Sequence, residues 1–194
     1  MLEIYTMSVN EIDFSDICGK LSQKRAKKLE KMKSESARRQ SIAAELVLNR
    51  AIGETFPDIK TPVVWDYDEY GKPYLTEHSG VYINISHSGD YAVCAVSDTP
   101  VGVDIQLMRE CNLNIAKRYL TAEELEYVNG AKERFYEVWV RKESFSKAVG
   151  KGLQLPLKKI SVLGSTVSYE DKIYKLQMCD TYSDYKMCVC TLLR

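Results

Sequence analysis

Apolar and polar residues along this chain switch between a helical repeat and strict alternation. Apolar positions three and four residues apart indicate helices, and alternating positions indicate half-buried strands. The pattern predicts helices near residues 22–33, 37–56, 121–128 and 134–150. It predicts strands near residues 1–7, 62–67, 81–86, 91–97, 101–107, 159–164, 167–171, 173–179 and 185–193. We therefore expect a mixed α/β protein.

The predicted elements fall into two similar sets, each a helical stretch leading into antiparallel strands. Ser-Asp-Thr-Pro at residues 97–100 forms a short turn between them and no flexible linker. A chain of 194 residues can bury roughly 70% of its unfolded surface. That is enough for one large domain or for two small fused halves.

The formal net charge is zero, with 27 basic and 27 acidic residues, so nothing global indicates nucleic-acid binding. Residues 20–39 differ, because they hold nine Lys or Arg against Glu30 and Glu35. A solvated helix face is the usual explanation of such a run. A nucleic-acid patch is disfavoured, since no aromatic residues are interleaved for stacking.

Residues 1–7 alternate like a first strand and lack the basic and apolar regions of a signal peptide. No segment requires a membrane, so we expect a cytoplasmic protein. The six cysteines include no C-x-x-C pair and no histidine at metal-binding spacing. We expect buried thiols in a reducing compartment.

Two segments carry candidate chemistry. In Val-Gly-Val-Asp-Ile-Gln-Leu at residues 101–107, a strand would place Asp104 and Gln106 on one face. In residues 139–153, Trp139, Glu143 and Lys147 recur every four residues, on one stripe of a helix. Two carboxylates and an amide oxygen suit a hard cation such as Mg²⁺.

Each segment also has an ordinary explanation. Taken alone, the strand pattern is more often that of a half-buried edge strand with a wet outer face. Glu143 and Lys147 are spaced like a helix-surface ion pair that contributes about 0.3–0.5 kcal/mol.

Taken together, the sequences of the two segments resemble the motifs of the 4′-phosphopantetheinyl transferases, specifically the larger surfactin-synthetase-activator (Sfp) type. That signature pairs a G-[IV]-D-[IV]-E strand with a W-x-x-K-E-x-x-x-K-x-x-G-x-G-L helix and turn. Gly-Lys-Pro at 71–73, Asn-Ile-Ser-His-Ser at 84–88 and a basic helix start at 22–27 also match in order. The resemblance extends from about residue 20 to about residue 157.

The resemblance implies a fold of two similar α/β halves, each with helices packed on a mainly antiparallel sheet, related by a pseudo-twofold axis. The halves would be residues 1–98 and 99–194, and the second carries the metal-binding motifs. The active site would lie in the cleft between them.

The implied activity is transfer of 4′-phosphopantetheine from coenzyme A to a serine of an acyl or peptidyl carrier protein, with release of 3′,5′-ADP. By resemblance, the metal ligands would be Asp104, Gln106 and Glu143, and the catalytic residues Asp104, Glu143 and Lys147. Whether Glu143 or a water molecule accepts the serine proton stays open. Coenzyme A, the co-substrate, would be bound by Lys24, Lys27, Arg39, Lys72, Ser86, His87 and Lys147.

Two positions depart from a simple match. Gln106 stands where the family commonly has a second acid, which removes one negative charge from the site. Metal binding should then depend more on substrate phosphates. Glu124 matches an acid of the family segment F-F-S-x-x-E, but Thr121-x-x-Glu124 is also a capping box, so its role stays open.

Other functions were weighed against this one. The small trimeric carrier-synthase type is disfavoured, because its G-[IV]-D strand lies at the extreme N-terminus and here it starts at residue 102. A catalytically weak coenzyme A or nucleotide-binding module is the main alternative, and a basic nucleic-acid-binding protein is a third. We expect a monomer with no membrane or nucleic-acid partner. No short motif identifies the carrier protein or its pathway.

Overall fold

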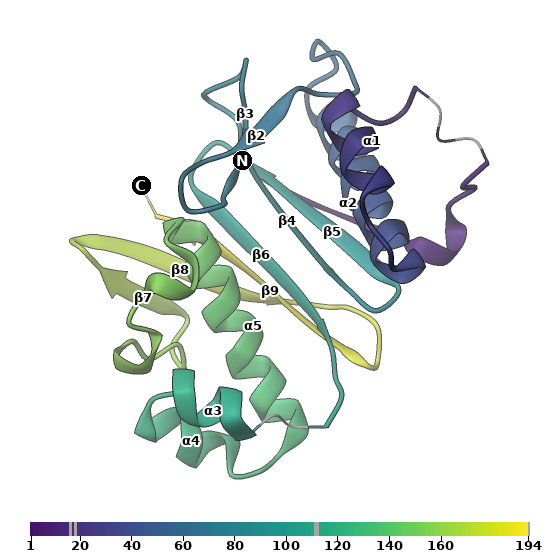
Figure 1. Cartoon of the computed structure of the whole chain (residues 1–194). Coiled ribbons are helices and arrows are strands. Elements are labelled where there is room, and N and C mark those ends of the chain that lie inside the picture. Colours follow the sequence, from purple (N-terminus) through teal and green to yellow (C-terminus); the bar gives the residue numbers. More distant parts are fainter. Residues whose placement is uncertain (16, 18, 111–112, 194) are drawn as a thin grey trace.

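The computed structural model describes residues 1–15, 17, 19–110 and 113–193 (Figure 1). Its strands are β1 (Leu2–Ser8), β2 (Trp65–Tyr67), β3 (Pro73–Leu75), β4 (Tyr82–Ser88), β5 (Tyr91–Ser97), β6 (Val101–Leu107), β7 (Thr166–Tyr169), β8 (Lys172–Cys179) and β9 (Tyr185–Leu192). Its helices are α1 (Gln23–Glu30), α2 (Glu35–Thr55), α3 (Leu113–Tyr119), α4 (Ala122–Val128) and α5 (Lys132–Val149). Within the described ranges, no helix combines the length and apolar character needed to cross a bilayer.

The first large sheet has the strand order β1-β5-β4, and α2 packs on one of its faces. Ser34 starts α2 as its N-cap, because its hydroxyl accepts a hydrogen bond from the amide of Ala37. The helix buries an apolar stripe that includes Val47. On β4, Ile83 and Ile85 pack into this core, so the residues between them face away from α2.

The second large sheet has the order β6-β9-β8-β7, and α5 lies across it (Figure 1). Phe135, Val138 and Phe145 of α5 belong to one apolar cluster with Tyr174 and Leu176 of β8, and Phe145 contacts Tyr174. In both sheets the first strand pairs with the last one in sequence, β1 with β5 and β6 with β9. All of these pairings are antiparallel, so the predicted mixed α/β fold with mainly antiparallel sheets is confirmed.

A third apolar cluster joins the two sheets. Val93 and Ala95 of β5 pack with Val103 and Ile105 of β6 and with Val189 of β9. The two sheets therefore share one core between them, and each keeps a separate core under its own helix.

The predicted strand at residues 159–164 is wrong. This segment contains a short 3-10 helix, Leu157–Lys159, followed by irregular backbone. Its polar groups bond to side chains, since Lys142 donates to the Ile160 carbonyl and Glu124 accepts from the Val162 amide. The strand β3 and the helix α3 were not predicted.

The four described cysteines are free thiols. Cys94, Cys188 and Cys190 are buried as expected, whereas Cys179 is only partly buried. Burial raises the pKa of Cys188 to about 12, so this thiol is protonated at neutral pH. Cys18 and Cys111 lie outside the described residues.

Candidate active site

The site is built where α5 rests directly on β6. A Cβ added at Gly102 would lie 2.1 Å from the backbone oxygen of Ser144 and 2.4 Å from the backbone nitrogen of Ala148. Such distances exclude any side chain, so glycine permits this close approach of the two backbones. The approach brings the polar side chains of α5 against those of β6.

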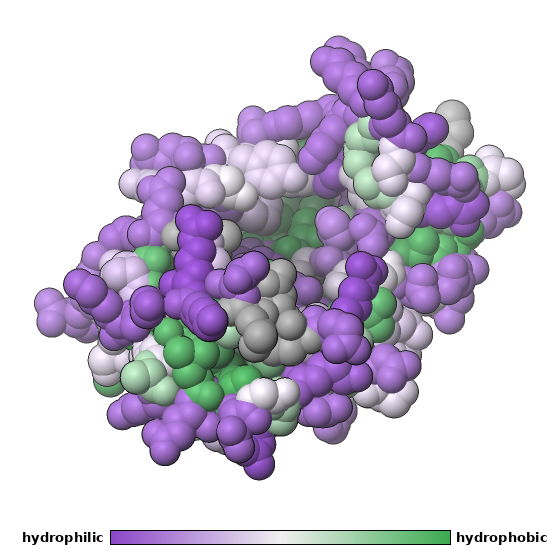
Figure 2. Space-filling view, turned by 60° about the horizontal axis from the view of Figure 1, so that its bottom comes forward, coloured by the Kyte–Doolittle hydropathy of each residue, from purple (hydrophilic) through white to green (hydrophobic). Residues whose placement is uncertain are grey.

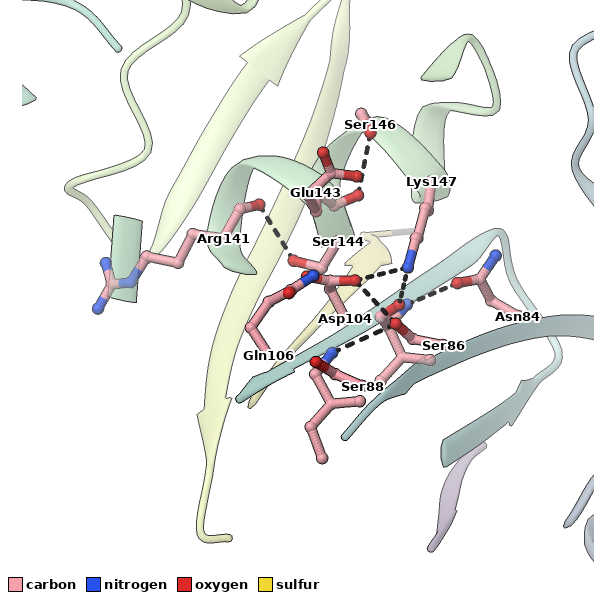
Figure 3. Close-up of polar contacts among 12 residues, drawn as sticks. Asn84, Ser86, Ser88, Asp104, Gln106, Arg141, Glu143, Ser144, Ser146 and Lys147 are labelled. Atoms are coloured by element: carbon pink, nitrogen blue, oxygen red, sulfur yellow. Dashed lines mark hydrogen bonds and ion pairs between the residues drawn. The ribbon is translucent and has the colours of Figure 1, made fainter. Parts of the chain in front are cut away.

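The carboxylate of Asp104 is the centre of the resulting cluster (Figure 3). It is 2% exposed, and its Oδ1 accepts from Lys147 Nζ at 2.7 Å and from the Ser86 hydroxyl at 2.8 Å. Its Oδ2 accepts from Gln106 Nε2 at 3.1 Å. Lys147 also donates to the Val103 carbonyl at 3.0 Å. Four residues predicted for the site, from β4, β6 and α5, therefore meet in one hydrogen-bonded group.

Glu143 lies beside this group, and its side chain is half-buried (Figure 3). Burial and then the nearby charge of Asp104 raise the pKa of Glu143 to about 7, while Lys147 acts in the opposite direction. Two acids thus share one ammonium group, which leaves an excess of negative charge when both ionise.

This donor set fits a hard divalent cation. A cation near Asp104 and Glu143 would relieve their repulsion, and the Gln106 amide offers a third oxygen. The described residues contain no group of three His, Cys, Asp or Glu side chains arranged for a metal. The candidate site has only two such side chains, Asp104 and Glu143, and its third oxygen is the amide of Gln106.

A cavity of about 290 Å³ opens beside the cluster. It is lined by residues from both the first and the second half of the sequence. Its lining includes Arg25, Lys28, Trp65, Tyr67, His87 and Lys147. The face of the molecule in Figure 2 is hollowed near its middle, where hydrophobic surface lies inside a hydrophilic rim. Cationic side chains and aromatic rings around one cavity suit an anionic ligand that carries an aromatic base.

Arg25 is held rigidly at this cavity. Its Nε donates to Glu45 Oε2 at 2.7 Å, one guanidinium nitrogen donates to the Ser41 hydroxyl at 2.7 Å, and its guanidinium lies 5.0 Å from the Trp65 ring centroid. Lys28 lies on the same side of α1, and burial together with the charge of Arg25 lowers its pKa. These two cations were not predicted as binding residues.

The predicted binding residues of α1 and α2 lie elsewhere. Lys24 pairs with Asp66, and Lys24 and Lys27 line a neighbouring hollow. Arg39 pairs with Glu35 at 3.1 Å, also away from the cavity lining. The helical repeat could have identified these residues. Arg25 and Met32 lie four residues before and three residues after the buried Leu29, and Lys28 lies three residues after Arg25, so all of them are on one side of the helix. Arg25, Lys28 and Met32 line the cavity.

Lys72 and His87, two other predicted binding residues, line the cavity. Lys72 Nζ donates to the Ala148 carbonyl at 2.8 Å, and burial lowers its pKa to about 8. The pKa of His87 is also lowered, mainly by burial and then by the charge of Lys147. An anionic ligand would counteract both effects. Ser86 is not among the cavity-lining residues, since its hydroxyl faces Asp104.

Glu124 takes part in a buried structural network. The capping box with Thr121 is present, with Glu124 Oε2 accepting from the Thr121 amide at 2.8 Å. Glu124 Oε1 accepts from the Val162 amide at 2.8 Å, and Lys142 pairs with Oε2 at 2.8 Å. Lys142 also donates to the Leu157 carbonyl at 2.7 Å. Both charged groups are fully buried and outside the cavity lining, so the contacts described for them are structural ones.

Comparison with known proteins identifies relatives of this chain. The model of the 4′-phosphopantetheinyl transferase superfamily matches residues 100–190. A 4′-phosphopantetheinyl transferase of Bacillus subtilis is 32% identical over 168 residues, which cover 75% of each chain. The 4′-phosphopantetheinyl transferase Sfp of Bacillus subtilis (strain 168) is 31% identical, over 77% of this chain and 72% of its own.

The chain belongs to the 4′-phosphopantetheinyl transferase family. It is accordingly an enzyme of the transferase class. A crystal structure of a holo-(acyl-carrier-protein) synthase from Bacillus anthracis in complex with CoA (3′,5′-ADP) aligns with 49% of this chain and 91% of its own. The TM-score is 0.42 and the identity is 20%.

Proposed function

We propose that this protein transfers the 4′-phosphopantetheine arm of coenzyme A to a serine of an acyl or peptidyl carrier protein, with Mg²⁺, and releases 3′,5′-ADP. The observation that carries the proposal is the meeting of Asp104, Glu143 and Lys147 beside a cavity rich in cations. Membership of the transferase family supports the reaction class.

Coenzyme A would bind in the cavity, between the halves formed by residues 1–98 and 99–194. Lining residues come from both halves, which supports an active site between them. The fixed cation Arg25, with Lys28 and His87, would face the phosphates, and the rings of Trp65 and Tyr67 would face the adenine.

Asp104, Glu143 and the amide oxygen of Gln106 would hold Mg²⁺. The bound ion would neutralise phosphoryl charge and contribute several kcal/mol of transition-state stabilisation. The Gln106 amide now donates to Asp104, so its oxygen would have to turn toward the ion.

The residues of the chain would complete the chemistry. Lys147 would leave Asp104 and neutralise the diphosphate of coenzyme A as negative charge moves to 3′,5′-ADP. Glu143 and a water molecule are the two candidate acceptors of the serine proton. Lys72 would reach the 3′-phosphate only by leaving the Ala148 carbonyl.

Our proposal also includes the setting of the reaction. The two fused halves would work as a monomer in the cytoplasm, with a carrier protein as the macromolecular partner. No nucleic acid or membrane would be required.

A catalytically weak coenzyme A-binding module is the second candidate. Gln106 favours it, because its amide occupies one oxygen of Asp104 and adds no negative charge for a metal. Such a module would retain ligand without turnover.

Intact-mass analysis of apo carrier proteins tests both candidates. The protein, coenzyme A and Mg²⁺ should add one phosphopantetheine arm to at least one carrier and release an equal amount of 3′,5′-ADP. Asp104→Ala and Glu143→Ala should nearly abolish the gain, while Glu170→Ala, at an exposed ion pair with Lys151, should leave it unchanged. Binding of coenzyme A with no mass gain on acyl and peptidyl carriers alike would favour the binding module.

A further inference from the structure

The strands β4 and β6 lie side by side at the junction of the two large sheets, and each is an outermost strand of its own sheet (Figure 1). Across the part of the chain that the structure describes, the two strands share no backbone ladder. A buried strand edge without partners leaves backbone N–H groups unbonded, which is costly.

Three side chains of β4 bond to that edge (Figure 3). Asn84 Oδ1 accepts from the Val103 amide at 2.9 Å. The Ser86 hydroxyl accepts from the Ile105 amide at 3.4 Å, and the Ser88 hydroxyl accepts from the Leu107 amide at 3.0 Å. Each contact joins residues 19 positions apart, so the two strands run in the same direction at constant register.

Alternation on both strands produces this side-chain ladder. On β4, Ile83 and Ile85 face the α2 core. The alternate residues Asn84, Ser86 and Ser88 therefore point away from it. On β6, only alternate residues direct their N–H groups to β9, and the others direct theirs to β4. A side-chain acceptor at every second position of β4 therefore meets an N–H donor at every second position of β6.

The ladder sets the place of Asp104. Asp104 lies between two of the bonded β6 residues, and its carboxylate accepts from Ser86 in the same ladder. A shift of β6 relative to β4 would move Asp104 away from Ser86 and from the cavity wall on β4. A displacement of about 1 Å at a reacting group can cost a hundredfold in rate.

From this geometry, we propose that Asn84 and Ser88 are positioning residues, which hold Asp104 in register by bonding the backbone of β6 on either side of it. The proposal rests on the proposed function for its kinetic consequence only. The amide orientation of Asn84 follows from chemistry, because the Val103 N–H can only donate and must therefore meet the oxygen.

Ser88 provides the cleanest test, because it is not among the residues that line the cavity. Ser88→Ala removes the acceptor for Leu107, whereas Ser88→Thr keeps a hydroxyl. Asn84→Ala combined with Ser88→Ala removes both outer contacts. Ser97→Ala is the matched control, since Ser97 is buried on β5 and its hydroxyl bonds to the Met1 carbonyl and accepts from the Thr99 amide, not from an amide of β6.

Three measurements separate positioning from stability. NMR amide exchange reports the N–H groups of Val103, Ile105 and Leu107. Electron paramagnetic resonance of free Mn²⁺, used as the metal probe, gives a dissociation constant without turnover. Transfer to a carrier gives kcat and KM, each measured well below the unfolding temperature of every variant.

We expect the double variant to exchange the three amides faster, to bind Mn²⁺ about tenfold more weakly and to lose about tenfold in kcat, as when a residue that orients a metal ligand is removed. Ser88→Ala should show a smaller change in the same direction, and Ser88→Thr should restore the wild-type values. Ser97→Ala should change stability alone.

Unchanged amide exchange would overturn the proposal. So would faster exchange with Mn²⁺ affinity and kcat equal to those of Ser97→Ala. If the double variant does not fold, the comparison of Ser88→Ala with Ser88→Thr decides. If wild-type protein binds Mn²⁺ but modifies no carrier, the proposed function fails, while the exchange and Mn²⁺ measurements still judge the ladder.

Discussion

Asp104 accepts two hydrogen bonds on Oδ1 and one on Oδ2, so a cation would compete with these donors for the carboxylate. Lys147 carries one of those donors, and Gln106 carries another. At the scale of single residues, the ammonium of Lys147 therefore balances the charge of Asp104 and leaves an ionised Glu143 as the excess negative charge. Metal affinity then depends on the free energy needed to displace these two side chains from Asp104.

Gln106→Glu should lower the Mg²⁺ concentration for half-maximal transfer, because it replaces a donor to Asp104 with a charged ligand. The substitution is nearly isosteric, so packing should be preserved. Mg²⁺ titrations with and without coenzyme A would measure the effect, and the dependence on coenzyme A should also fall. An unchanged midpoint would place Gln106 outside the coordination shell.

The pKa of Glu143 predicts a pH-dependent cost of folding. A carboxyl group whose pKa rises from 4.5 to about 7 on folding destabilises the native state as pH rises above 4.5, and the cost is complete above pH 7. In metal-free buffer, Glu143→Gln should match the wild type near pH 4 and exceed its unfolding free energy by about 3 kcal/mol at pH 8.

Urea unfolding at several pH values would measure this difference. Glu170→Gln, at an exposed position, serves as the control. A stability difference that is equal at pH 4 and pH 8 would contradict the assigned cause. Added Mg²⁺ should stabilise the wild type and leave Glu143→Gln little changed.

At the scale of elements, the contact of α5 with β6 depends on one missing Cβ. Gly102→Ala should force the helix away from the strand, because the new atom would overlap backbone of Ser144 and Ala148. We expect a loss of about 1–3 kcal/mol of stability and at least a tenfold loss of transfer.

Gly53→Ala is the matched control, since its nearest neighbour is the Thr61 Cγ2 at 3.8 Å and alanine favours a helix by about 1 kcal/mol. Thermal unfolding and intact-mass kinetics would measure both variants. Wild-type transfer by Gly102→Ala would show that the spacing of α5 and β6 is not critical.

The buried pair of Glu124 and Lys142 ties α4 to α5 and to the irregular segment after α5. Glu124→Ala should cost about 3–5 kcal/mol of unfolding free energy, because it leaves a buried ammonium unpaired. Protein that remains folded at low temperature should keep its kcat. A large loss of kcat with little loss of stability would instead assign Glu124 to the reaction.

The same pair explains one failed prediction. Residues 159–164 are rich in the residue types of a strand, but their backbone is bonded by Lys142 and Glu124 side chains from distant helices. Local pattern contains no trace of such contacts. The strand β3 spans three residues, which is too short for alternation to be visible.

The proximity of the candidate site residues could be predicted where they follow one element. Asp104 and Gln106 share a strand face and Glu143 and Lys147 share a helix face, and the structure brings these faces together. The basic cluster was harder, because neighbouring residues on a helix differ by about 100° in direction. Lys24 was chosen where Arg25 lines the cavity, a difference of one residue that turns the side chain away.

At the scale of the whole molecule, the cluster of Val93, Ala95, Val103, Ile105 and Val189 belongs to both sheets at once. Neither half can expose its share of this core without losing hydrophobic stabilisation. We therefore expect one cooperative unfolding transition, with equal calorimetric and van't Hoff enthalpies. Two resolved transitions in a metal-free sample would show that the halves unfold independently.

The pairing of each first strand with its last strand also matters during synthesis. Leu2 of β1 pairs with Ser97 of β5, so a nascent chain cannot close its first sheet until nearly half of it has left the ribosome. The strand β6 follows after a short turn, yet it waits for β9 as its partner. Before β9 is made, the side chains of β4 can already accept hydrogen bonds from the exposed amides of β6. The contacts that fix the register would then also protect the edge of β6 from pairing with the wrong strand.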